Sequence, residues 1–143
     1  MSYLSNFVLN VQPRQAWDLL AKERNAVLID VRSELEITKD GRPDLSSIGK
    51  ATYLVPWQNS IGSMIENDFS TELSRLFPKK EETVLLFMCK AGVRSKMAAD
   101  KALSIGYKHC LNIEDGFEGA VNKNGETSQI SGWKFSKLPW EKV

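Results

Sequence analysis

Short apolar runs alternate with amphipathic stretches along this chain of 143 residues. Apolar positions spaced three and four apart predict helices over 13–22, 33–37, 68–77 and 95–105. The runs that predict strands are Val8–Val11, Ala26–Ile29, Thr52–Val55, Val84–Met88 and Cys110–Ile113. Strands that alternate with helices are typical of α/β domains. We therefore expect a central, mostly parallel five-stranded sheet flanked by helices on both faces.

The segment Val84–Met88 gives the clearest strand prediction, because it is short and wholly apolar, as a strand buried on both faces must be. Residues 39–47 are polar and include Gly41 and Pro43, which predicts a loop. The chain length predicts a single domain over 1–143. Within it, we expect residues 121–143 to form a tail that packs back on the domain.

The composition excludes several classes of protein. Hydrophobic residues make up 42% and charged residues 26%, which is a globular mixture and not that of a disordered chain. The net charge is +1, so neither general nucleic-acid binding nor membrane-surface binding is expected. The longest apolar run has about six residues, against the roughly 20 that a membrane span needs. The first six residues carry no export signal, which predicts a cytoplasmic protein.

Histidine and cysteine are too few for most metal centres. His109 is the one histidine, and Cys89 and Cys110 are the two cysteines, so neither a multi-histidine nor a four-cysteine zinc site can form within the chain. We expect no metal and no cofactor. Two cysteines without an export signal indicate free thiols in a reducing compartment, and one of them is the place to look for chemistry.

The loop that follows Val84–Met88 carries the chemical signal. It begins with Cys89 at the carboxyl end of a buried strand and leads into a helix, where backbone N–H groups and the helix dipole favour an anion. Gly92 permits the tight turn. Four basic residues and one acidic residue lie within 89–101, and this surrounding stabilises a nucleophilic thiolate.

This loop resembles the active-site loop of rhodanese-type sulfurtransferases, in its cysteine, its glycine and its arginine-serine pair. The resemblance extends over about residues 8–140, and its further motifs are Leu28–Arg32 with Glu36, Ala98, Ala99 and Leu103, Gly106–Tyr107, Asp115–Phe117, Gly132–Trp133 and Leu138–Trp140. It implies a single-domain rhodanese-like fold without a cofactor.

The resemblance also implies roles for the residues of the loop. Cys89 would accept a sulfane sulfur as a persulfide and pass it to a thiol or a cyanide-like acceptor. Arg94 would help to hold an anionic donor such as thiosulfate, while Asp30 and Arg32 would support the loop from behind. The residues expected to surround the transferred sulfur are Lys90, Ala91, Gly92, Val93 and Ser95.

Each of these residues also has a plainer interpretation. Cys89 can be a buried structural thiol, and Arg94 and Lys90 can be solvated side chains. Cys110 begins the next predicted strand, so in a parallel sheet it lies roughly 15 Å from Cys89, too far for a disulfide. We therefore expect Cys110 to be a core residue.

Two other functions compete with sulfur transfer. A cysteine-based phosphatase or arsenate reductase also places a thiolate in an anion cradle. In protein tyrosine phosphatases, however, the arginine follows the cysteine by six positions, and Arg94 follows Cys89 by five. A persulfide carrier or binding module that serves a protein acceptor is the third possibility, with the tail from Val121 as a docking element.

Overall fold

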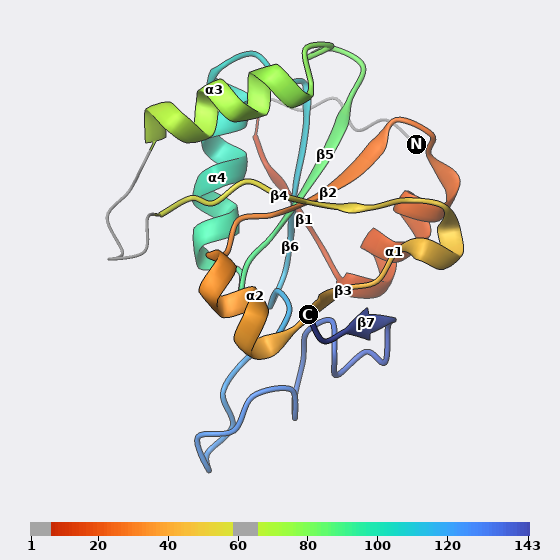
Figure 1. Ribbon diagram of the computed structural model, residues 1–143, viewed down its shortest axis with the longest axis vertical. Coiled ribbons are helices and arrows are strands. Elements are labelled where there is room, and N and C mark those ends of the chain that lie inside the picture. Colours follow the sequence, from red (N-terminus) through yellow and green to blue (C-terminus); the bar gives the residue numbers. More distant parts are fainter. Residues whose placement is uncertain (1–6, 59–65) are drawn as a thin grey trace.

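The structure of the protein is a computed structural model that describes residues 7–58 and 66–143. Residues 1–6, for which the sequence predicts no export signal, lie outside the described residues. Five strands form one sheet in which every neighbouring pair is parallel (Figure 1). Their order is β1 (Leu9–Val11), β6 (His109–Ile113), β5 (Val84–Met88), β2 (Ala26–Asp30) and β4 (Thr52–Leu54). The sheet predicted from the apolar runs is therefore confirmed.

Helices cover both faces of this sheet, as predicted. Helices α3 (Glu66–Leu76) and α4 (Val93–Ser104) lie on one side and α1 (Pro13–Lys22) on the other (Figure 1). Side chains of β5 alternate between the two layers: Leu85 and Phe87 join the cluster under α3 and α4, and Leu86 joins the cluster under α1. Because both faces are covered, the central strand is apolar throughout.

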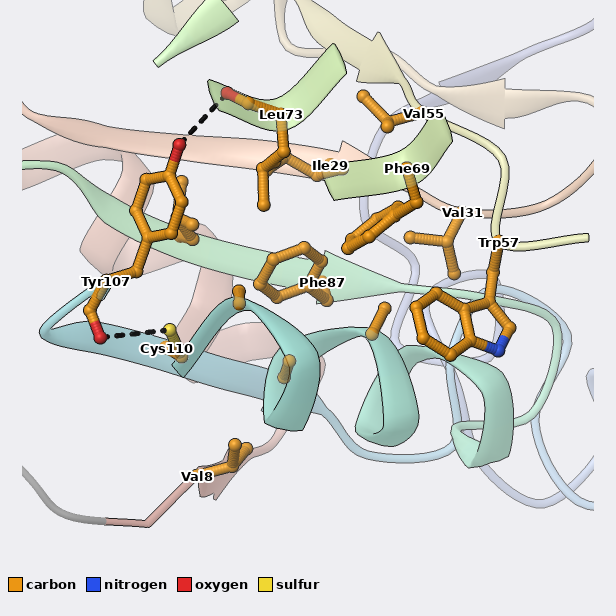
Figure 2. Packing of buried hydrophobic residues seen from close by; sticks show 14 of the residues in the cluster. Val8, Ile29, Val31, Val55, Trp57, Phe69, Leu73, Phe87, Tyr107 and Cys110 are labelled. Carbon is orange, nitrogen blue, oxygen red and sulfur yellow. Dashed lines mark hydrogen bonds between the residues drawn. The ribbon is translucent and has the colours of Figure 1, made fainter. Parts of the chain in front are cut away.

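The cluster under α3 and α4 is rich in aromatic rings (Figure 2). The rings of Phe69 and Trp57 pack in a T-shaped arrangement, and Phe69 lies beside Phe87. The Tyr107 hydroxyl donates to the backbone oxygen of Leu73 at 3.0 Å, which satisfies a polar group inside an apolar layer. Cys110 belongs to this layer, as expected for a core residue.

The segment 39–47 is more ordered than the predicted loop. It contains the short strand β3 (Arg42–Pro43), which pairs antiparallel with β7 (Trp140–Glu141), and Ser46–Ile48 forms a 3₁₀ turn. The loop prediction was wrong here because the strand's partner lies about 98 residues away along the chain. The end of the chain thus returns to the domain, and the side chain of Trp133 is fully buried there.

Helix α4 begins earlier than predicted. It starts at Val93 and not at Ser95, and Gly92 is its N-cap residue with φ +100°. No side chain of the cap marks this start, so the usual serine or aspartate signal was absent from the sequence. Arg94 and Ser95 therefore lie in the first helical turn, close to the end of β5. None of the helices within 7–58 and 66–143 is long and apolar enough to cross a membrane.

Candidate active site

Cys89 follows β5 directly, at the carboxyl edge of the sheet. Its side chain is fully buried, and its Sγ accepts the backbone N–H of Gly92 at 3.1 Å. The positive φ of Gly92 turns this amide toward the sulfur. The first N–H groups of a helix have no partner within the helix. Cys89 therefore lies where backbone dipoles favour negative charge on sulfur.

Arg94 is held by a carboxylate from another part of the chain. Its Nη1 and Nη2 donate to the two carboxylate oxygens of Glu36, at 2.6 and 2.8 Å. Glu36 belongs to α2 (Glu34–Asp40), where it also completes the capping box with Ser33. This arrangement fixes the guanidinium beside the loop with a geometry that lysine could not reproduce.

The ion pair between Arg94 and Glu36 shifts the pKa of both residues. The hydrogen bonds from Arg94 lower the pKa of Glu36 from 4.5 to about 2. The pKa of Arg94 is raised, first by Glu36 and also by the charges of Cys89 and Asp30. The positive charge near Cys89 is thus partly balanced by Glu36, which a charge count over residues 89–101 did not include.

Asp30 and Arg32 form a buried ion pair behind the loop. Nη2 of Arg32 lies 2.7 Å from Oδ2 of Asp30, and both side chains are fully buried. The guanidinium carbon of Arg32 also lies 4.4 Å from the centre of the Phe117 ring. Because the backbone N–H of Phe117 donates to the carbonyl of Cys89 at 2.8 Å, this pair contacts the segment that holds Cys89 in place.

Ser95 connects Cys89 to a series of hydrogen-bonded polar side chains, which the sequence did not predict. Its Oγ lies 3.2 Å from the Cys89 Sγ and donates to Oδ1 of Asn112 at 2.6 Å. Nδ2 of Asn112 donates in turn to Oδ1 of Asn10 at 3.1 Å and to the carbonyl of Gly92 at 3.3 Å. Asn10 and Asn112 are register partners on β1 and β6, so their side chains share one face of the sheet.

The remaining residues of the loop lie at its outer surface. Lys90, Ala91 and Val93 are exposed. A crevice of about 600 Å³ borders the loop on the side of β1 and β6, and Asn112 and Gly92 contribute to its wall. Lys96 also lines this crevice and pairs with Asp100 at 3.0 Å, which offsets a second basic charge of the loop region.

The second cysteine lies away from this site. Cys110 pairs in register with Leu85, four residues before Cys89 on the neighbouring strand, and both cysteines are free thiols. Burial raises the pKa of the Cys110 thiol to about 12. Within the described part of the chain, no group of three or more His, Cys, Asp or Glu residues is arranged to hold a metal ion.

Sequence reasoning assigned roles to the loop but gave none to Glu36, Asn112 or Asn10. The capping-box spacing of Ser33 and Glu36 was a visible signal for a helix start, although not for a contact with Arg94. Asn112 is a polar residue in the buried part of its strand, between Leu111 and Ile113, and that exception was the available signal for a polar partner near Cys89.

A parallel α/β sheet with a cysteine loop at the carboxyl end of its central strand, backed by an Asp-Val-Arg strand end, defines a rhodanese-like protein. The protein family described as the STR4 middle domain matches residues 10–143. The chain belongs to this family.

Relatives and solved structures agree with this assignment. An uncharacterized protein of Rickettsia conorii is 36% identical over 134 residues, which are 94% of this chain and 98% of that protein. The protein THYLAKOID RHODANESE-LIKE, chloroplastic, of Oryza sativa subsp. indica is 30% identical over 130 residues, 91% of this chain but 24% of the longer rice protein. The crystal structure of Rv0390 from M. tuberculosis superposes with a TM-score of 0.85 at 36% identity, covering 96% of this chain and 99% of that one.

Proposed function

We propose that the protein is a sulfurtransferase that takes a sulfane sulfur from a small anionic donor and passes it to a thiol or a cyanide-like acceptor. The observation that carries this proposal is the surrounding of the Cys89 sulfur, which accepts the Gly92 N–H at the N-terminus of α4. Such a position stabilises a thiolate, and it equally suits a persulfide anion on the same residue.

The reaction runs in two displacements at sulfur. With thiosulfate as the donor, the Cys89 thiolate attacks the outer sulfur, a new S–S bond forms, and sulfite leaves with the electron pair of the broken bond. The acceptor thiolate or cyanide then attacks the outer sulfur of the persulfide, and the Cys89 thiolate leaves. No net oxidation or reduction of the protein results, and no cofactor is required.

Arg94 has a double role in this proposal. Its two hydrogen bonds to Glu36 use two of the five N–H donors of a guanidinium. The remaining donors can meet an oxygen of the anionic donor. The exposed residues Lys90, Ala91 and Val93 complete the surface that the donor approaches.

Location and partners belong to the same proposal. Two free cysteines suit a reducing compartment, and we place the protein in the cytoplasm. A protein acceptor in place of a small thiol would use the same persulfide on Cys89.

The test is a transfer assay with thiosulfate and cyanide on the wild type and on Cys89→Ser. We expect thiocyanate from the wild type and a rate at the uncatalysed level from the variant. Equal rates would contradict the proposal. An aryl phosphate is offered in a parallel assay, and hydrolysis that depends on Cys89 would favour phosphatase chemistry instead.

A further inference from the structure

The side chain of Asn112 has one orientation that fits its neighbours. Gly92 offers it a carbonyl oxygen, which accepts hydrogen bonds and cannot donate them. The amide nitrogen of Asn112 must therefore face Gly92, and the amide oxygen faces Ser95. The second contact of this nitrogen, with Oδ1 of Asn10 at 3.1 Å, is consistent with the same orientation.

This orientation fixes the direction of the Ser95 hydroxyl proton. A serine hydroxyl has a single hydrogen, and at 2.6 Å it is donated to Oδ1 of Asn112. Toward Cys89, 3.2 Å away, Oγ of Ser95 then has only lone pairs to offer. The contact between Oγ and Sγ is thus satisfied when Cys89 carries its proton and donates it.

We propose that Asn112 is a positioning residue that controls the ionisation of Cys89 through Ser95. In the resting protein Asn112 holds the hydroxyl hydrogen, so that Ser95 offers only lone pairs to the Cys89 sulfur. When the thiol proton leaves to solvent, the Ser95 hydroxyl turns its hydrogen from Asn112 to the sulfur anion, and Asn112 loses one hydrogen bond. The importance of this control for turnover rests on the proposed sulfur transfer, because the thiolate is the attacking species.

Charged groups of several elements lie around this loop, and Lys96, Glu114 and Asp115 line the crevice beside Asn112. Arg94 on α4 interacts electrostatically with Cys89 and is paired with Glu36 of α2. Arg32 and Asp30, at the end of β2, form a buried pair that is neutral as a whole. Lys90 is exposed. All of these charges stay unchanged when Asn112 is substituted.

The experiment measures the pH dependence of the Cys89 thiolate by its ultraviolet absorbance, with each variant compared with the same protein carrying Cys89→Ser. Cys110 does not contribute to this absorbance near neutral pH, because burial raises its pKa to about 12. We expect Asn112→Leu to move the midpoint to lower pH by about one pH unit, since Ser95 then donates permanently to sulfur.

Two further variants separate this role from a loss of packing. Asn112→Asp keeps a strong acceptor for Ser95 and adds negative charge, so its midpoint moves to higher pH, opposite to Asn112→Leu. In a Ser95→Ala background, Asn112→Leu no longer moves the midpoint. The proposal is overturned if Asn112→Leu has no effect, if both variants move the midpoint in the same direction, or if the shift survives in Ser95→Ala.

The proposed sulfur transfer is read separately, as the gain of one sulfur by the wild type after treatment with thiosulfate. If the wild type gains no sulfur while the midpoints move as expected, the sulfur-transfer proposal fails and the role of Asn112 stands. If it gains sulfur while the midpoints do not move, the role of Asn112 fails alone.

Discussion

The two cysteines of this protein are almost equally buried, with 0% of Cys89 and 4% of Cys110 exposed, yet their surroundings differ completely. Cys89 lies at the carboxyl edge of the sheet and contacts a backbone N–H and a hydroxyl. Cys110 lies on the neighbouring strand within an apolar layer, where its contact is a long one, 3.9 Å, to the carbonyl of Tyr107 (Figure 2).

This difference shows that burial alone does not decide how polar the surroundings of a thiol are. An apolar surrounding disfavours the thiolate, which is why the pKa of Cys110 is high. The N-terminus of α4 and the Arg94–Glu36 pair give Cys89 a polar surrounding in spite of its burial. The place of each cysteine along its strand, four residues apart in register, decides which surrounding it meets.

Removing each thiol in turn tests the difference between the two cysteines most directly. We expect Cys89→Ala to lower the rate of sulfur transfer by roughly 10⁴-fold or more, because the nucleophile is lost. Cys110→Ala should keep that rate within about twofold and lower the free energy of unfolding by about 1 kcal/mol through a small cavity. Transfer assays and urea unfolding on both variants check this. A large loss of activity in Cys110→Ala would contradict it.

The buried Asp30–Arg32 pair lies behind the loop that begins with Cys89. Arg32→Met leaves Asp30 buried without its partner, and we expect the free energy of unfolding to fall by about 3–5 kcal/mol. The matched control is Arg42→Met, which breaks the exposed pair with Glu141 and should cost at most about 1 kcal/mol. Similar losses in the two variants, measured by urea unfolding, would mean that the buried pair gives the loop no special support.

A glycine behind the loop offers a sharper steric test. A Cβ on Gly116 would lie 2.3 Å from the carbonyl oxygen of Cys89, whereas a Cβ on Gly125 would meet nothing within 4 Å, and both residues have positive φ. Gly116→Ala should therefore lose about 2–3 kcal/mol more than Gly125→Ala and should also slow sulfur transfer. Equal stabilities of the two variants would show that the loop can move aside without cost.

The Arg94–Glu36 pair predicts a smaller effect that depends on pH. The pKa of Glu36 is about 2 in the folded protein and 4.5 ordinarily, so the carboxylate stabilises the fold above pH 4.5. That contribution fades as the pH falls from 4.5 toward 2. We expect Glu36→Gln to be about 1–2 kcal/mol less stable at neutral pH and to differ less from the wild type near pH 2. A constant difference across this range, in unfolding followed by circular dichroism, would argue against the pair.

The sheet and the position of the Cys89 loop could be predicted because their signals are local. Val84–Met88 is an unbroken apolar run, and a thiol directly after it must lie at the edge where ligands bind in such sheets. The helix over Pro13–Lys22 was predicted to start at Pro13 and to end near Lys22, since Pro13 marks its start and its apolar side is periodic.

The features that could not be predicted from the sequence depend on contacts between residues that are far apart along the chain. Arg94 meets Glu36 across 58 positions, and Ser95 meets Asn112 across 17, so no local pattern pairs them. The start of α4 was placed two residues late because a glycine with positive φ, and not a side-chain cap, begins that helix. The strand Arg42–Pro43 exists only because Trp140–Glu141 returns to it.

The central claim is that Cys89, and not Cys110, carries the transferred sulfur. The mass of the protein after treatment with thiosulfate, followed by peptide mapping, tests it most directly. We predict a gain of roughly 32 Da, one sulfur atom, on the peptide that contains Cys89, and its loss when an acceptor thiol is added. No gain in mass, or a gain on the peptide that contains Cys110, would contradict the account.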